Sequence, residues 1–585
     1  MNSKITLKNR YSFGNNIELY FDFLNKAKTY SLLNQTVFIL GDPIINDKIN
    51  FSLIIDKIEK NEFNNSFIKN IDGEFLIIIV ENNTSVEIIN DRFSSIPIFY
   101  SLENKKFRAS INFLTIFREI KNKNLNHNKF IEFLYFQRIH GEDTYERSIK
   151  SLNSATKIKY NQGIVKQTKY WYQNYKKDYN LSIDDYSKIL SDLIYKSIET
   201  KISDIDINEN FGLFLSGGMD SRTVLGSFKK KRPTAFTLGF SEFGEYRVSK
   251  KITKIISNKH NLIKLDKDHF SINFDKLIHL CSGLYRFDHG IFCGIEKEIS
   301  KVCKIVINST ALDYWFQGYY IPKINIKLLN KPTYFNKMRS QDGEFEDDYF
   351  HNIPYKFKNV NPLDYLINHT KRNDAENFIK NEIKKIYELG MKNGCYNFYD
   401  SWDYILNENI SRHFSYSNNL SMHASCQPRT IAFYNQIFDL FLKIPAEYRF
   451  GAKVSKKTLK RVNYKFSKVI SANHGMKITA SPLEMTLHTI FKKIMSKISN
   501  SKIFKHPTAE DRTWPDSYDY LKKNKFLYQK ALDLKSSDYL LSAIPNINMD
   551  KLNKDIDNWL SGDSSGGDIL YRLITINEFL KKGYK

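Results

Sequence analysis

The chain has 585 residues, long enough for two to four domains, and 42% of them are hydrophobic and 14% aromatic. This composition excludes a disordered protein and predicts a globular one with substantial cores. The formal net charge is +24, but its lysines are spread among asparagines and isoleucines without a basic block. Nucleic acid is therefore not expected as a partner, and an anionic substrate accounts for the charge at least as well.

The N-terminus and the cysteines bear on location. The first ten residues, MNSKITLKNR, lack the apolar core of a signal peptide, and no apolar run is long enough to cross a bilayer. The five cysteines form no CxxC pair, which is typical of reduced thiols. We therefore expect a cytoplasmic protein without membrane insertion. The cysteines are Cys281, Cys293, Cys303, Cys395 and Cys426.

Residues 1–175 have a strand-rich pattern. Residues 74–80 and 86–89 predict two strands joined by a hairpin-type turn, and residues 128–136 predict a helix. Three short motifs, DGEF at 72–75, NDRF at 90–93 and PIFY at 97–100, resemble the glutamine amidotransferase half of asparagine synthetases. This resemblance implies an N-terminal-nucleophile (Ntn) hydrolase-like αββα domain over residues 1–175.

The nucleophile of that family is missing. Members of the family carry a cysteine directly after Met1, whereas this chain has Asn2 and no cysteine before Cys281. Without a thiol at the mature N-terminus there is nothing for glutamine to acylate. We expect a domain without glutaminase activity and, as nitrogen donor, free ammonia or an amine.

Residues 176–585 contain the strongest motif of the chain. An amphipathic helix is predicted over 183–201. The apolar run 211–215 is followed by Ser-Gly-Gly-Met-Asp-Ser at 216–221 and by a helix-compatible run from Thr223. A strand, a glycine turn and a helix N-terminus in this order favour binding of a phosphate group. Asp220 adds an oxygen ligand for the Mg²⁺ that accompanies a nucleotide.

A second motif follows a later strand. Residues 234–240 and 304–307 predict further buried strands, and their alternation with helices indicates a doubly wound parallel sheet with ligands at the carboxyl ends of the strands. Asp313 comes shortly after the strand at 304–307. With Asp220 it forms a pair of carboxylates suited to Mg²⁺.

Together the two motifs resemble the ATP-pyrophosphatase domain of asparagine synthetases, with β-lactam synthetases and lasso-peptide cyclases among the relatives. The resemblance implies that residues 176–585 form this domain, with a helical C-terminal part. It implies ATP and Mg²⁺ as cofactors, with Asp220 and Asp313 as the metal ligands. The ATP-binding residues that it implies are Leu215, Ser216, Gly217, Gly218, Asp220, Ser221, Leu238 and Ser309.

The substrate half of the motif departs from the family. Thr310 stands where many asparagine synthetases have a glutamate that helps the amine to attack, and Tyr314 replaces a carboxylate. Lys477 is the candidate for the family's lysine that stabilises charge on the acyl-adenylate, which makes Thr310 and Lys477 the candidate catalytic residues. Residues 321–394 predict helices and loops over the site.

The sequence therefore predicts an ATP-dependent amide-forming ligase. The resemblance implies that it adenylates a small-molecule or peptide carboxylate and couples it to ammonia or an amine, in specialised peptide, β-lactam or surface-polysaccharide biosynthesis. Two alternatives stay open: an RNA- or nucleotide-modifying ATP pyrophosphatase, and an inactive scaffold. A homodimer is also left open.

Overall fold

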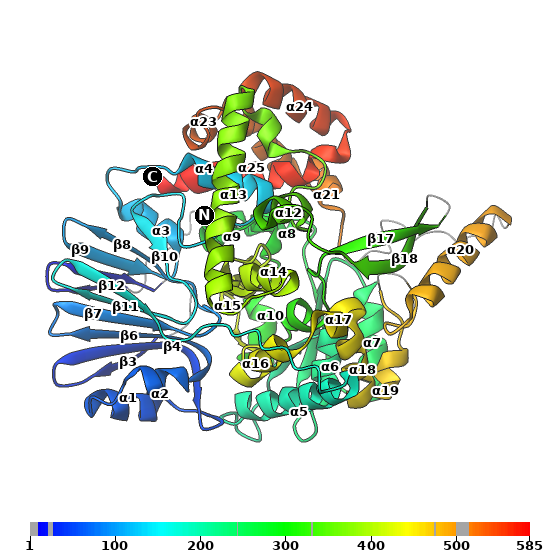
Figure 1. Ribbon diagram of the computed structural model, residues 1–585, viewed down its shortest axis with the longest axis horizontal. Coiled ribbons are helices and arrows are strands. Elements are labelled where there is room, and N and C mark those ends of the chain that lie inside the picture. Colours follow the sequence, from blue (N-terminus) through cyan, green and yellow to red (C-terminus); the bar gives the residue numbers. More distant parts are fainter. Residues whose placement is uncertain (1–9, 22–26, 243, 329–330, 473–474, 499–513) are drawn as a thin grey trace.

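Two packed β-sheets form the first part of the molecule, and a parallel sheet surrounded by helices forms the rest (Figure 1). The computed structural model describes residues 10–21, 27–242, 244–328, 331–472, 475–498 and 514–585. Among these residues, none of the helices has the length and apolar character needed to span a membrane.

The two packed sheets belong to the first 169 residues, and this α/β architecture confirms the predicted fold. One sheet has the strand order β1 (Arg10–Phe13), β2 (Ile17–Tyr20), β9 (Lys106–Ser110), β8 (Phe99–Glu103), β10 (Ile149–Ser151). The other has the order β12 (Ile164–Lys169), β11 (Thr156–Asn161), β7 (Ser85–Asn90), β6 (Asp72–Glu81), β4 (Gln35–Ile45), β3 (Lys28–Ser31), and β5 (Lys48–Ile49) pairs with β4.

Strand β6 explains why this part of the sequence is so apolar. Its side chains alternate between two cores, because successive strand residues point to opposite faces of a sheet. Ile78 lies in the core between the two sheets, and Ile77 packs on the other face with helices α1 (Phe51–Glu59) and α2 (Asn65–Lys69). The predicted hairpin is confirmed, with Glu81 paired to Ser85 at the turn between β6 and β7.

The second sheet system is fully parallel. Its strand order is β15 (His260–Lys264), β14 (Thr234–Gly239), β13 (Gly212–Phe214), β16 (Ile305–Asn308), β19 (Gln427–Thr430). From β13 the chain moves outward to β14 and β15 and then returns to add β16 on the other side. This order confirms the doubly wound sheet and places its topological switch point between β13 and β16.

The helix after β13 begins earlier than the sequence predicted. Helix α6 spans Met219–Ser227, not a run from Thr223, because Gly218 takes an extended conformation and acts as the N-cap. Asp220 and Ser221 therefore lie in the first helical turn. Before the sheet, helix α5 (Ile183–Lys201) has the predicted bounds and begins with a capping box between Ser182 and Asp185.

The remaining helices surround the parallel sheet and form most of the C-terminal part. Three are long, α13 (His369–Lys392), α20 (Pro482–Ile498) and α25 (Gly567–Gly583). The earlier ones are α3 (Phe113–Glu119), α4 (His127–Phe136), α7 (Glu245–Ile255), α8 (His269–Ile272), α9 (Phe274–Cys281), α10 (Glu296–Ser300), α11 (Leu312–Phe316), α12 (Phe345–Asn352) and α14 (Phe398–Asn407). The later ones are α15 (Ser417–His423), α16 (Asn435–Lys443), α17 (Ala446–Arg449), α18 (Lys453–Val462), α19 (Tyr464–Lys468), α21 (Ser517–Lys523), α22 (Lys525–Leu532), α23 (Asp538–Ala543) and α24 (Met549–Ser561).

The sequence prediction for residues 321–394 was incomplete. Besides helices, this region contains an antiparallel hairpin of β17 (Lys323–Leu328) and β18 (Lys331–Met338). The strict alternation Lys-Ile-Asn-Ile-Lys-Leu over β17 is a strand pattern. The division of the chain at residues 175 and 176 stays a prediction; it falls between the end of β12 and the start of α5.

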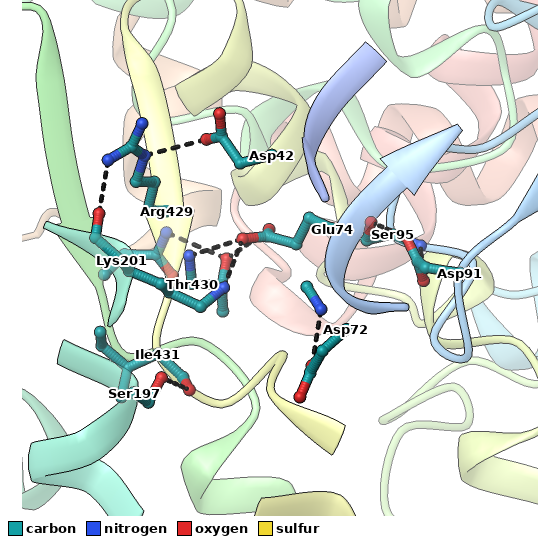
Figure 2. Close-up of polar contacts among 12 residues, drawn as sticks. Asp42, Asp72, Glu74, Asp91, Ser95, Ser197, Lys201, Arg429, Thr430 and Ile431 are labelled. Carbon is teal, nitrogen blue, oxygen red and sulfur yellow. Dashed lines mark hydrogen bonds and ion pairs between the residues drawn. The ribbon is translucent and has the colours of Figure 1, made fainter. Parts of the chain in front are cut away.

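The two parts are joined by buried charges (Figure 2). The Glu74 carboxylate, on β6, accepts hydrogen bonds from the Thr430 backbone N–H at 2.8 Å and from its hydroxyl at 2.9 Å, and it pairs with Lys201 of α5 at 3.3 Å. Arg429, which is fully buried, bonds Asp42 from the first part and Asp204 from the second. Burial raises the pKa of Glu74, while Lys201 and Thr430 act in the opposite direction.

Replacing Glu74 tests this junction. Glu74→Gln leaves the buried Lys201 ammonium without its counter-charge, and breaking such a pair costs about 3–5 kcal/mol of unfolding free energy. We expect a clearly lowered melting temperature, measured by differential scanning calorimetry.

The matched control is Glu87→Gln, which removes a partly exposed pair with Lys157 at 3.1 Å. Pairs of this kind contribute about 0–1 kcal/mol. Equal melting temperatures for the two variants would show that the Glu74 contacts do not stabilise the junction.

Candidate active site

A cavity of about 310 Å³ opens at the switch point between β13 and β16. It gathers the loop after β13, the loop after β16 and the start of α15. This is the position at which open parallel sheets bind their ligands. Of the sequence-predicted residues, the cavity is lined by Leu215, Ser216, Asp220, Ser221, Leu238, Ser309, Thr310 and Asp313.

The loop after β13 is folded by its own hydroxyl groups. The Ser216 N–H donates to the Ser221 hydroxyl oxygen at 3.1 Å, and the Gly218 N–H donates to the Ser216 hydroxyl oxygen at 3.1 Å. Gly218 offers no side chain to cap the first-turn amides of α6. These amides and the positive end of the helix dipole can therefore bind an anion such as a phosphate.

The two glycines act through close packing and do not themselves line the cavity. A Cβ atom at Gly217 would lie 3.3 Å from the Ala472 Cβ atom, and one at Gly218 would lie 3.1 Å from the Ser216 hydroxyl oxygen. Neither residue has a positive φ. These close contacts within the protein leave little room for a side chain at either position, and ligand contact by Gly217 and Gly218 stays a prediction.

Arg222 supports the loop from beneath, a role that the sequence analysis missed. Its buried guanidinium donates to the Gly217 carbonyl oxygen at 2.8 Å and, from the other side, to the carbonyl oxygens of Val469 at 2.9 Å and Ile470 at 2.8 Å. Burial lowers the pKa of Arg222 to about 10. The residue directly follows the glycine motif, but nothing in the spacing shows that its partners lie some 250 positions away.

Two carboxylates face the cavity together. Burial raises the pKa of Asp220 well above its usual range, and the nearby Asp313 adds to the rise. Burial likewise raises the pKa of Asp313 to about 6. No lysine, arginine or histidine occurs among the described residues that line the cavity. Bringing two carboxylates together without a cation is unfavourable, so this pair fits a divalent metal ion.

The remaining ligands of such an ion would come from elsewhere. In the described part of the chain, no cluster of three or more histidine, cysteine or acidic side chains is arranged to hold a metal. Mg²⁺ is commonly bound by one or two carboxylates together with nucleotide phosphates and water. The site therefore fits Mg²⁺ that arrives with ATP, and Asp220 and Asp313 would be its protein ligands.

Gln317 is a second residue that the sequence analysis missed. Its side-chain amide N–H group donates to both Asp220 carboxylate oxygens, at 2.8 and 2.9 Å. Gln317 directly follows α11, which carries Asp313, so the same short segment supplies one carboxylate and donates hydrogen bonds that stabilise the charged form of the other. In the absence of a cation this amide holds Asp220 in place.

The opposite wall of the cavity carries a chain of hydrogen bonds. The Tyr314 hydroxyl lies 2.6 Å from the Ser415 hydroxyl, which lies 3.0 Å from His413 Nδ1, and His413 Nε2 lies 3.0 Å from the Tyr320 hydroxyl. Tyr314 and Ser415 line the cavity, whereas His413 is buried. Burial lowers the pKa of His413, so its imidazole is neutral and can accept a proton at one nitrogen while releasing one at the other.

The two candidate catalytic residues occupy different places. Thr310 lines the cavity, and its backbone N–H donates to the Asn308 side-chain oxygen at 3.1 Å. Lys477 is exposed and is not among the lining residues. Its backbone pairs with Ile470, the residue whose carbonyl oxygen Arg222 binds. A catalytic role of Lys477 stays a prediction.

The cysteines do not supply a glutaminase nucleophile in the first part of the molecule. All five lie beyond residue 280 and are buried free thiols. Burial raises the pKa of Cys303 to about 11 and that of Cys293 to about 12, which keeps both protonated. Asn2, at the family's nucleophile position, lies outside the described residues.

Two family models match the chain. Residues 203–467 match the model described as asparagine synthase, and residues 58–171 match the model described as a glutamine amidotransferase domain. The first match contains the glycine loop, both carboxylates and Ser415, and the second contains β6 and β7. A search of curated proteins finds no match.

The Gln317 amide and a metal ion would compete for the same Asp220 carboxylate oxygens, and replacing Gln317 tests this competition. In Gln317→Ala, Asp220 loses its hydrogen bond, and bonds to charged groups contribute about 1.5–3 kcal/mol. We expect Mg²⁺ to bind about tenfold more tightly, measured by isothermal titration in the presence of a non-hydrolysable ATP analogue.

The control is Gln436→Ala, which removes a glutamine amide far from the cavity that donates to the Tyr434 hydroxyl. Weaker binding of Mg²⁺ in Gln317→Ala would contradict the competition and would instead make the Gln317 amide oxygen a metal ligand.

Proposed function

We propose, for a chain that belongs to the asparagine synthetase family of ATP-dependent, amidotransferase-like ligases, that it forms an amide by first adenylating a carboxylate. The observation that carries this proposal is the pair of half-buried carboxylates, Asp220 and Asp313, beside the N-terminus of α6 in one cavity. A family of this kind acts on a carboxylate and on ammonia or an amine.

In the first step, ATP binds with its phosphates on the 216–221 loop. The first-turn amides of α6 and the hydroxyls of Ser216 and Ser221 hold the phosphates, and Asp220 with Asp313 would hold Mg²⁺. When bound, the metal ion neutralises charge that develops on the leaving pyrophosphate. The substrate carboxylate attacks the α-phosphorus, which gives an acyl-adenylate and pyrophosphate. The loop contributes mainly by positioning and by electrostatic stabilisation.

In the second step, an amine attacks the acyl carbon and AMP leaves. The attacking nitrogen must lose a proton. Ser415, on the cavity wall, takes this proton as its own hydroxyl proton passes to His413 Nδ1, and the Tyr320 hydroxyl holds the imidazole at Nε2. The proton leaves the imidazole on the phosphate of the departing AMP. This hydrogen-bonded chain replaces the carboxylate that Thr310 and Tyr314 no longer provide. Lys477 remains the proposed cation for the acyl-adenylate.

The nitrogen source follows from the missing thiol. With no cysteine in residues 1–280, glutamine has no nucleophile that could release its ammonia. We propose free ammonia or a substrate amine in its place. Either source is compatible with a small-molecule or a peptide carboxylate, in specialised peptide, β-lactam or surface-polysaccharide biosynthesis.

The alternatives have less support. A match to a glutamine amidotransferase domain is not expected of an RNA-modifying pyrophosphatase. A scaffold without activity would have no need for two half-buried carboxylates side by side in one cavity. The pKa values of both are raised, and the described residues that line the cavity include no cationic side chain.

The two half-reactions can be measured separately. ATP–pyrophosphate exchange is assayed against a panel of amino acids, uronic acids and acidic peptides, and hydroxamate formation with hydroxylamine is then followed for the acid that supports exchange. We expect Asp220→Asn to lower exchange by at least about a hundredfold, because the pair loses its charge towards the metal ion. Ser415→Ala should keep exchange and slow hydroxamate formation by about a hundredfold.

The matched control is Asp184→Asn, an exposed carboxylate on α5 that pairs with Lys457 and Arg461 on the surface. It should leave both half-reactions unchanged. Full exchange in Asp220→Asn would refute the metal assignment, and equal loss of both half-reactions in Ser415→Ala would refute the proton path.

A further inference from the structure

The hairpin β17–β18 and helix α20 form an arm that projects from the body of the molecule (Figure 1). We use the word arm for residues 323–328, 331–338 and 482–498. Within it the Tyr334 N–H donates to the Thr486 hydroxyl oxygen at 3.2 Å, and Thr486 is buried against the hairpin. The helix thus has one side on the hairpin and the other side away from it.

The outer side of α20 is apolar and exposed. Leu483, Leu487, Ile490 and Phe491 follow the spacing i, i+4, i+7, i+8, which places them on one side of a helix. They are 55%, 56%, 41% and 56% exposed. Thr486, by contrast, is 9% exposed. The apolar side of α20 is therefore exposed to solvent, whereas apolar side chains of other helices in this molecule are buried.

The hairpin carries exposed apolar side chains of its own. Ile324, Ile326 and Leu328 alternate along β17 and are 44–57% exposed. Single exposed apolar residues need no explanation, but a group of large ones on one side of an element marks an interaction surface. In this arm α20 and β17 each carry such a group.

The arm is also strongly basic. Its three segments contain seven lysines and one acidic residue, Glu484, and the two strands contain no acidic residue at all. They contain no arginine either. A partner complementary to the arm therefore has negative charges at its surface and an apolar layer beneath them.

We propose that the arm docks on an anionic lipid surface, with α20 lying in the headgroup region. A helix with leucines and a phenylalanine on one side and lysines nearby is typical of interfacial membrane binding. Lysines beside an anionic leaflet contribute attraction that a neutral surface does not. The arm also exposes the aromatic side chains of Tyr334, Phe335 and Phe491, but recognition of single-stranded nucleic acid would add arginine to such side chains, and the three segments contain none.

The arm begins close to the cavity, so docking of the arm would also position the cavity at the lipid surface. Strand β17 begins four residues after Tyr319, whose pKa is raised by burial and by the charges of Asp313 and Asp220. The base of the arm is thus close to the carboxylate pair. If the proposed function holds, docking brings the mouth of the cavity to the lipid surface, where a membrane-borne carboxylate could enter.

Co-sedimentation of the full-length protein with vesicles tests the proposal without knowledge of the substrate. Vesicles of phosphatidylcholine alone are compared with vesicles containing 30% phosphatidylglycerol. We expect binding only to the second kind, weakened by salt because exposed charges are screened. The double variant Leu487→Asp/Phe491→Asp should lower partitioning at least tenfold. The double variant Lys327→Ala/Lys331→Ala should lower it about thirtyfold, because each lysine contributes roughly 1 kcal/mol.

The matched control is Leu33→Asp/Tyr396→Asp, because these two residues are 98% and 79% exposed and lie outside the arm. It should bind like the unchanged protein, and all variants should keep its melting temperature. Absence of binding to the anionic vesicles would overturn the proposal. So would binding that the arm variants do not weaken, or an arm-dependent dimer in sedimentation velocity, which would assign the surface to a second copy of the chain. Failure of exchange activity leaves this test unaffected.

Discussion

The buried Glu74 carboxylate is the constraint on which the arrangement of this molecule depends. It accepts a hydrogen bond from the Thr430 hydroxyl, whose oxygen accepts one from the Asn308 side-chain N–H group at 3.2 Å. The Asn308 side-chain oxygen in turn accepts a hydrogen bond from the Thr310 N–H at 3.1 Å. A continuous path thus runs from β6 to the cavity. Because each buried polar group has a partner, the loop after β16 has one favourable position.

This path explains what a glutamine amidotransferase domain contributes when its thiol is missing. Its sheets supply Asp42, Asp72 and Glu74, which bind Arg429, the Asn435 N–H and Thr430 of the other part. Removing the domain would take Asp42 away from Arg429 and Glu74 away from Lys201. The face that these contacts cover would then lie in water, and the contacts that position β19 and α5 against the first part would be lost. Retention of the domain therefore follows from packing and electrostatics and does not require glutamine hydrolysis.

The sequence predicted those parts of the fold and site that depend on local patterns. Helix α5, the hairpin of β6 and β7 and the parallel sheet follow from periodicity, and the glycine loop follows from a short motif. It did not predict Gln317, Arg222 or the chain from Tyr314 to Tyr320. The partners of Arg222 and of this chain are distant in sequence. The contact of Gln317 with Asp220 depends on how the ends of β13 and β16 lie next to each other. Hydrogen bonds of this kind leave no periodic signal.

The electrostatics of the cavity differ from those of the chain as a whole. The chain carries a net charge of +24, yet the described lining residues of the cavity include three acidic side chains and no basic one. A bound Mg²⁺–ATP would bring its own cation, so the protein needs negative ligands at this point and not positive ones. A substrate with a second free carboxylate would find no cationic side chain among these residues. The cavity wall instead offers the hydroxyls of Thr310, Tyr314 and Ser415, so under the proposed function we expect a substrate whose remaining groups are neutral or positively charged.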